Sequence, residues 1–406
     1  QDGAMSAYHL DCNLTAHAAA DFQCELNELQ RSWHAAGLYE GSLPAVLGEG
    51  LLVLLLLATS SWLSLRRPLL GGSLVGLAKL AAFRLAHRAG HHAGTFRLDS
   101  WPSLHFATTM LVSNVASGID FGWWRWQHQL HHRYTMSVED PQMPKHGDFL
   151  PICAWEDAPL ASFLEKHPLL GSPLRLQELW WLPVLLLAGN PYISWLSYDG
   201  IPKASPNPGG MPCRRLGLLM HWVSLALAAW RWVWKRLGSA ASGERLRATG
   251  WWLLAGWIVS ATIHPLFLFN HIQTGYTSSV EPDNKVMQFC HTSNYVMTLP
   301  FQSHFVPTTY HIEHHIAPKI PDEHLHLISG DVQKLARRFN LPYAEESLEH
   351  AIWKHTMVLA GIPRGKSGVG GGGRLLALAT VLAGGWAVLS ITLRSKRCPA
   401  RRRLLS

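Results

Sequence analysis

Three clusters of histidine stand out in this sequence, and their spacing suits metal binding. Box one spans residues 87–92, box two spans residues 128–132 and box three spans residues 311–315. Residues three and four positions apart lie on one face of a helix, so the His-x-x-His-His pattern of boxes two and three presents three imidazoles from one side. Box one adds a pair four positions apart. Imidazole is a good ligand for iron, zinc, copper and nickel.

Together the boxes predict a site for two metal ions rather than one. A zinc hydrolase site needs about three protein ligands, which would leave five boxed histidines unexplained. Soluble di-iron proteins use two Glu-x-x-His pairs, whereas Glu323 and His326 form the single such pair here. His92 competes with His91 for a place in the set. The eight candidate ligands are His87, His91, His128, His131, His132, His311, His314 and His315.

The residues around the boxes resemble those of the membrane fatty acid desaturase and hydroxylase superfamily. Box two follows Trp-Arg-Trp-Gln at 124–127, continues as Arg-Tyr-Thr at 133–135, and precedes Asp-Pro at 140–141. Box three matches the family pattern Tyr-His-x-Glu-His-His-x-x-Pro-x-x-Pro, ending at Pro318 and Pro321. The resemblance covers residues 80–335. One departure concerns Arg88, because most members of the family carry an acid directly after the first histidine.

The resemblance implies a di-iron centre, and it adds residues that spacing alone does not identify. A ninth histidine is expected between the last membrane span and box three, and we assign it to His271. His264 is better explained by core packing, while His291 and His304 are weaker alternatives for the ninth position. Family position favours His91 over His92. Carboxylates commonly orient metal-bound imidazoles, and Glu313 and Asp140 are the candidates for that role.

Composition indicates a membrane protein. Charged residues make up 15% of the 406 residues and hydrophobic residues 48%, whereas soluble domains contain roughly 25% charged residues. The net charge of +8 favours contact with anionic lipid headgroups. No basic helix or aromatic-rich binding motif supports a nucleic-acid partner.

Four apolar stretches are long enough to cross a bilayer, which takes about 20 residues. They pair as 44–65 with 69–86, and as 216–234 with 251–270. We therefore expect an all-α integral membrane fold with two transmembrane helical hairpins, and the family resemblance implies a histidine-rich cap on the cytosolic side. The expected domains are a polar N-terminal segment (1–43), a membrane desaturase domain (44–349), a Gly-rich linker region (350–373) and a C-terminal apolar helix with a basic tail (374–406).

Two apolar segments leave the topology open. Residues 176–196 contain Asn190-Pro191 and fit an interfacial helix better than an additional span. Residues 375–393 either form a C-terminal membrane helix or lie flat in the interface. If they span, the basic tail lies opposite the cap, against the positive-inside tendency. The basic loop between the second pair of spans raises the same conflict.

The leading functional hypothesis is oxygen-dependent desaturation of a fatty acyl chain, lipid- or CoA-linked, by a histidine-ligated di-iron centre. Alternatives are a hydroxylase or ketolase acting on a carotenoid, alkane or sphingolipid, and an inactive metal-binding relative. The His-Pro-Gly-Gly haem motif of fused cytochrome b5 domains is absent. A separate cytochrome b5 or ferredoxin is therefore the expected electron donor, unless an upstream part of the protein supplies one. The expected location is the endoplasmic reticulum or plastid membrane in a eukaryote, or the inner membrane in a bacterium.

Overall fold

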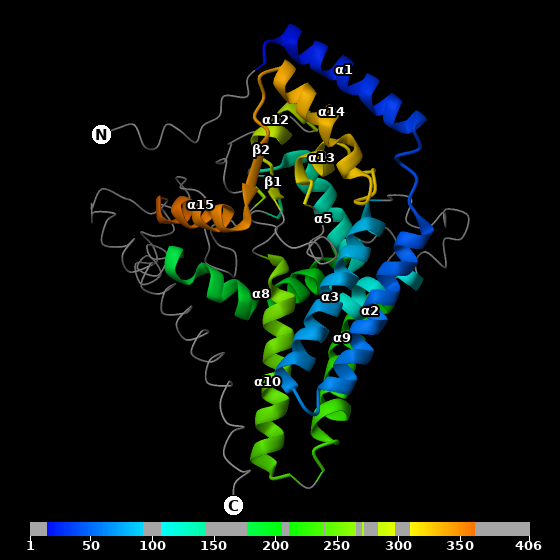
Figure 1. Ribbon diagram of the computed structural model, residues 1–406, viewed down its shortest axis with the longest axis vertical. Helices are drawn as coiled ribbons and strands as arrows, with labels where there is room; N and C mark the ends of the chain where they lie inside the picture. The colour runs from blue at the N-terminus through cyan, green and yellow to red at the C-terminus, as the bar shows by residue number, and fades with distance from the viewer. Residues whose placement is uncertain are drawn as a thin grey trace, which may run out of the picture.

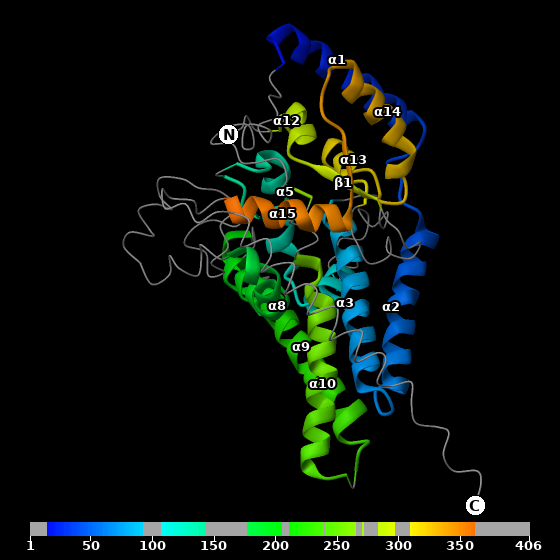
Figure 2. The ribbon, with the colours of Figure 1, turned by 60° about the vertical axis from the view of Figure 1, so that its left-hand side comes forward.

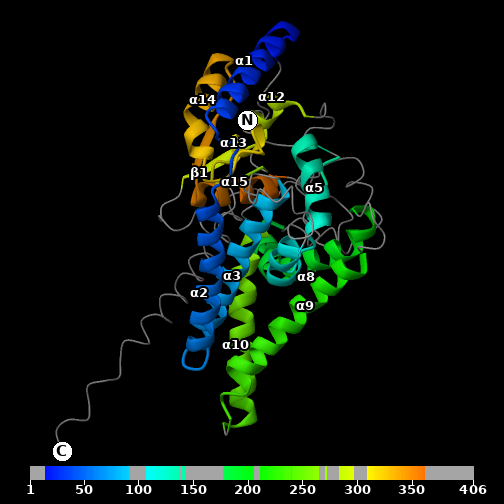
Figure 3. The same ribbon diagram turned by 90° about the vertical axis from the view of Figure 1, so that its right-hand side faces the viewer.

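The molecule consists of a bundle of long apolar helices that carries a cap of shorter elements (Figure 1). The computed structural model describes residues 14–91, 107–137, 139–142, 177–204, 211–238, 240–264, 270–271, 283–296 and 309–361. In Figures 2 and 3 the bundle forms the lower half of the molecule in both orientations. Helices α8 (Gln177–Ala204) and α15 (Leu348–Gly361) lie across the junction between bundle and cap. The predicted 375–393 helix lies outside the described residues.

Three described helices are long and apolar enough to cross a membrane. They are α2 (Leu43–Leu63), α3 (Pro68–Gly90), and α9 (Met211–Ala229) with its continuation η5 (Trp230–Trp234). Ser42 caps α2, and a proline lies in the first turn of both α2 and α3, where its missing N–H costs nothing. A short turn joins α2 to α3, as predicted. Helix α3 extends to Gly90, so box one lies in its last turns rather than beyond it.

Helix α10 (Ser242–Ala261) packs closely along α3. A Cβ atom added at Gly72 would lie 2.0 Å from the carbonyl oxygen of Trp252, and one added at Gly256 would lie 2.9 Å from that of Gly72. Small residues allow two apolar helices to approach at backbone distance, where van der Waals packing holds them together. Helix α10 begins nine residues before the start of the predicted span at residue 251. Its first turns contain Glu244 and two arginines, which the predicted apolar stretch left out. Of the predicted residues beyond 264, the structure describes only residue 270.

Helix α8 (Gln177–Ala204) is continuous through three internal prolines and extends eight residues beyond the predicted 176–196 segment. Pro191 cannot donate to the carbonyl of Leu187. That carbonyl instead accepts a hydrogen bond of 2.9 Å from the indole N–H of Trp257 in α10. The contact with α10 therefore satisfies the backbone group that the proline leaves free.

The cap has its own hydrophobic core beneath α1 (Ala16–Ala35) and α14 (Leu325–Arg338). Phe22, Leu26 and Trp33 of α1 pack against this core, so part of the segment expected to be polar is an amphipathic helix. The remaining elements of the cap are α12 (Lys285–Cys290), α13 (His311–Ile316), and strands β1 (Ser293–Val296) and β2 (Ala344–Ser347), which pair in parallel. Helix α15 (Leu348–Gly361) follows, where we expected the linker to start.

Candidate metal centre

The three boxes meet at the junction of bundle and cap. Box one ends α3, box two lies on α5 (Phe121–Tyr134) and box three forms α13. Their histidines fall into two groups of four, within each of which the ligand nitrogens lie within 4.8 Å of one another. The first cluster is His87, His91, His128 and His314; the second cluster is His131, His271, His311 and His315. Every member is buried except His91, which is partly exposed.

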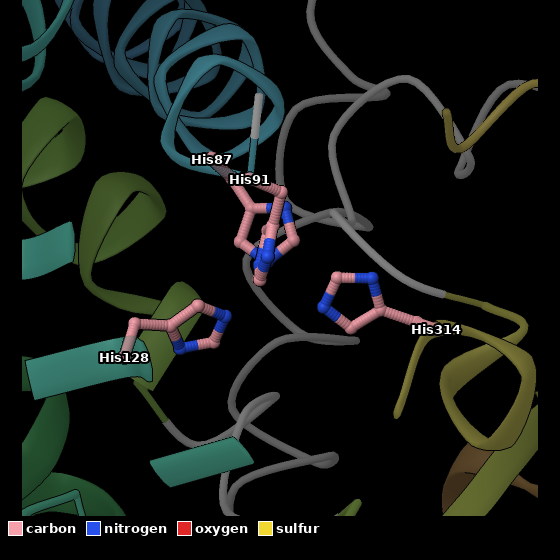
Figure 4. Close-up of side chains that lie close together, drawn as sticks. All are labelled: His87, His91, His128 and His314. Carbon is pink, nitrogen blue, oxygen red and sulfur yellow. The ribbon is translucent and has the colours of Figure 1, made fainter. Parts of the chain in front are cut away.

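The first cluster brings residues from three elements to one point. Figure 4 shows His87 and His91 descending from α3, His128 approaching from α5 and His314 from α13, with the four rings turned toward one another. The ring of His314 lies 4.8 Å from that of His87 and 4.6 Å from that of His91, centroid to centroid. Trp124 stacks on His128 at 4.4 Å. Packing therefore holds the rings of this cluster.

The ligand nitrogens of the second cluster lie at metal-binding distances from one another. The Nε2 atom of His271 lies 3.1 Å from that of His131 and 2.8 Å from that of His311, and His311 Nε2 lies 3.2 Å from His315 Nε2. Two imidazoles that bind one metal at right angles, each at ~2.1 Å, place their nitrogens roughly 3.0 Å apart. The observed distances fit that spacing, so the second cluster is suited to hold one metal ion.

Hydrogen bonds fix the tautomers of the second cluster. The Nδ1 atom of His271 donates to the carbonyl of His291 (2.9 Å), His315 Nδ1 lies 2.7 Å from the amide oxygen of Gln288, and His131 Nδ1 lies 2.8 Å from Asp140. With the proton on Nδ1, each Nε2 turns a lone pair toward the centre. Three lone pairs converging in a buried space repel one another unless a cation lies between them.

Neutral imidazole is the form that binds metal. Burial is the largest cause, and the proximity of other imidazoles the next, of a lowered pKa in this region. The pKa lies well below the usual histidine value for six residues: His128, His132, His271, His311, His314 and His315.

His132 belongs to neither group of four but lies between them. Its ring centroid is 4.8 Å from His91 and His314 and 4.2 Å from His315. Its Nε2 atom lies 3.2 Å from that of His128. All nine predicted histidines thus gather in one region, whereas His92 and His304 lie outside the described residues. His264 instead hydrogen-bonds Asn190 of α8 at 3.1 Å, in keeping with a packing role.

Asp140 orients His131 as predicted, and an unusual backbone turn brings it there. Met136 adopts a left-handed φ of 61°, which residues with a side chain rarely occupy. The turn reverses the chain after box two, and the Met136 N–H donates to Asp140 Oδ2 at 3.0 Å. Gln142 follows two residues later, with its amide oxygen 3.2 Å from His128 Nδ1.

Glu313 does not contact an imidazole in the predicted way. Its carboxylate accepts hydrogen bonds from Asn294 Nδ2 (2.8 Å) and Tyr343 Oη (2.5 Å). Asn294 also accepts the N–H of Ile312 at 2.8 Å. The buried carboxylate thus fastens box three to β1 and to the segment before β2. Gln288, Asn294 and Tyr343 carry no motif, and no sequence signal identified them.

Arg88 takes part in a buried group of ion pairs behind box one. Its guanidinium lies 3.0 Å from Glu49 of α2 and 2.8 Å from Glu323, which follows box three. One turn earlier, Arg84 lies 3.5 Å from both Glu49 and Asp322. Arg88 is 2% exposed. The arginine that departs from the expected acid therefore ties the box-one helix to α2 and to the cap.

A second buried ion pair holds the start of the box-two helix. Asp120 caps α5 by accepting the Trp123 N–H at 2.7 Å, and it also pairs with Arg214 of α9 (Nε–Oδ2 2.9 Å). Asn114 of η3 (Met110–Ser117) donates to the same carboxylate at 2.8 Å. The cap of α5 is thereby fixed to two elements of the bundle.

The sequence profile of the fatty acid desaturase family matches residues 61–347. This chain belongs to the fatty acid desaturase family. It is 25% identical over 366 residues to a Delta(8)-fatty-acid desaturase of Helianthus annuus, covering 84% of this chain and 75% of that protein. It is 27% identical over 274 residues to an acyl-lipid (9-3)-desaturase of Borago officinalis, covering 64% of this chain and 57% of the relative. Because the chain belongs to this family and has three described helices long and apolar enough to cross a membrane, it is a membrane oxidoreductase of the fatty acid desaturase type.

Proposed function

We propose that this enzyme inserts a double bond into a fatty acyl chain carried by a lipid or by CoA, using two iron ions held by the nine clustered histidines. The observation that supports the proposal most strongly is the division of eight imidazoles, seven of them buried, into two groups of four. Bound iron would supply the oxygen activation that side chains lack, since no protein group oxidises an unactivated methylene.

Electron balance requires a donor. Removing two hydrogens from adjacent methylenes yields two electrons and two protons. Reducing O₂ to two waters takes four of each, so two electrons and two protons come from elsewhere. We propose a separate cytochrome b5 or ferredoxin as the source of the electrons.

The protein's own residues would orient and shield the site. Asp140, Gln288 and the His291 carbonyl hold three imidazoles with their Nε2 atoms inward. Burial keeps the rings neutral and excludes water, which protects a reactive centre from side reactions. We propose that α2–α3 and α9–α10 form two membrane hairpins, with this site in the cap on the cytosolic side.

Expression in yeast followed by fatty acid profiling tests the function. A new unsaturated product is expected from the wild-type chain and not from a His311→Ala variant expressed at the same level. Separating phospholipids from acyl-CoA before the profile identifies the carrier. If iron-loaded protein supplied with a reductase makes no unsaturated product, the proposal fails.

A further inference from the structure

A cavity of about 510 Å³ lies in the bundle and reaches along α3 as far as Leu85, two residues before His87. Its walls come from α2, α3, η3, α9 and η5, and none of the box histidines is among the described residues that line it. Leu54 and Leu111 line the cavity and are 64% and 62% exposed. The cavity therefore opens onto the outer surface of the bundle, where lipid would contact a membrane protein. Ligand pockets commonly range over about 300–1,000 Å³.

Two basic side chains, Lys79 and His221, are among the described residues that line this largely apolar cavity. Lys79 lies eleven residues from either end of α3, which is about 16 Å along the axis and hence near the middle of a crossing bilayer. None of the described lining residues is acidic. A cation among apolar walls at that depth is costly, so the amine favours either deprotonation or an acidic partner.

His221 does not supply a second polar partner for a ligand. Its Nδ1 donates to the Val115 carbonyl at 2.8 Å, so the neutral ring carries its lone pair on Nε2. That Nε2 is enclosed by protein on the side of Gly118, where an added Cβ atom would lie 2.7 Å from it, and the side chain is 4% exposed. The cavity thus combines long apolar walls with the amine of Lys79.

We propose that this cavity binds a free long-chain fatty acid, with its carboxyl group at the amine of Lys79 and its chain along the apolar walls. A carboxylic acid enters the bilayer uncharged and can then give its proton to the amine, so no net charge crosses the apolar region. A phosphate headgroup keeps its charge and has no such route. The site goes beyond the proposed desaturation, because Lys79 lies eight residues, about 12 Å along α3, from His87.

Binding of labelled oleate to purified protein in phosphatidylcholine nanodiscs tests this site, with methyl oleate as the uncharged comparison and empty nanodiscs as background. No reductant is added, so desaturation does not enter the result. Saturable binding of one oleate per chain is expected, with methyl oleate at least about tenfold weaker, because a charge-assisted hydrogen bond is lost. Lys79→Met is expected to lower the affinity for oleate to the affinity measured for methyl oleate.

A second pair of variants leaves the amine in place. Leu54→Trp fills the cavity from its exposed side and should abolish oleate binding, whereas Leu51→Trp, on the same helix but not lining the cavity, should not. A melting curve confirms that each variant is folded. Equal binding of acid and ester, or unchanged oleate binding by folded Lys79→Met, would overturn the proposal and assign the cavity to the chains of ordinary phospholipids.

Discussion

The two histidine clusters have the same ligands in number and kind, yet they are held in different ways. Three members of the second cluster are oriented by hydrogen bonds to Asp140, Gln288 and a backbone carbonyl. In the first cluster His128 has one neutral partner, Gln142, and neither ring nitrogen of His314 has a hydrogen bond in the described structure. Ring packing positions these two histidines, and the ion pairs behind α3 position the helix that carries His87 and His91. The difference predicts that the two clusters fail in response to different mutations.

The largest effect is expected from Arg88→Met. Removing one partner of a buried ion pair leaves the remaining charges uncompensated, which costs about 3–5 kcal/mol. The box-one helix would loosen from α2 and the cap, so iron should fall from two toward one per chain, together with the melting temperature. Metal analysis and a thermal melt of purified protein measure both.

Arg133→Met is the matched control for Arg88→Met. Its pair with Asp283 is 48% and 60% exposed, and exposed pairs contribute about 0–1 kcal/mol. Both iron ions and the melting temperature should persist. If the two arginine variants behave alike, the ion pairs behind box one do not hold the first cluster.

Asp140→Asn should weaken the second cluster by about 10–100-fold in iron affinity or activity, because groups that orient metal-bound histidines typically contribute that much. The change keeps the side chain's shape and removes the charge beside His131. Iron titration of the apo-protein measures the affinity. Unchanged binding of the second iron would show that the Asp140 contact is incidental.

Gln142→Ala applies the same test to the first cluster and should have a smaller effect. The 3.2 Å contact to His128 is a neutral hydrogen bond, worth about 0.5–1.5 kcal/mol, so iron affinity should fall about tenfold or less. A loss equal to that of Asp140→Asn would contradict the contrast between the clusters.

Tyr343→Phe should have the smallest effect. Glu313 keeps its hydrogen bond from Asn294, so the protein should lose about 1 kcal/mol of stability and retain both iron ions. Loss of iron from this variant would mean that Glu313 acts on the metal centre rather than on the attachment of box three.

The eight boxed candidate ligands could be predicted from sequence because the spacing within each box is local, whereas His271 was expected only from the family resemblance. Their division between the clusters could not. His128 joins the first cluster while His131, one turn later on α5, joins the second; box three divides in the same way between His314 and His311. That division depends on how α3, α5 and α13 cross. The partners Gln288 and the His291 carbonyl lie on a different segment and belong to no motif.

The fold too could be predicted only where the signal in the sequence is local. The apolar runs predicted α2, α3 and α9 closely, because burial in lipid demands long uninterrupted hydrophobic stretches. The four-residue strands β1 and β2 are too short to show a period-two pattern. The start of α10 was missed because Glu244 and its neighbouring arginines lie at one end of the helix, where apolar composition does not mark the boundary.

Iron content per chain tests the central claim most directly. Purified wild-type protein is expected to bind two iron ions, His314→Ala and His311→Ala one each, and the double variant none. A wild-type protein that saturates at one iron ion, or single variants that both retain two, would contradict a centre built from two clusters of histidine.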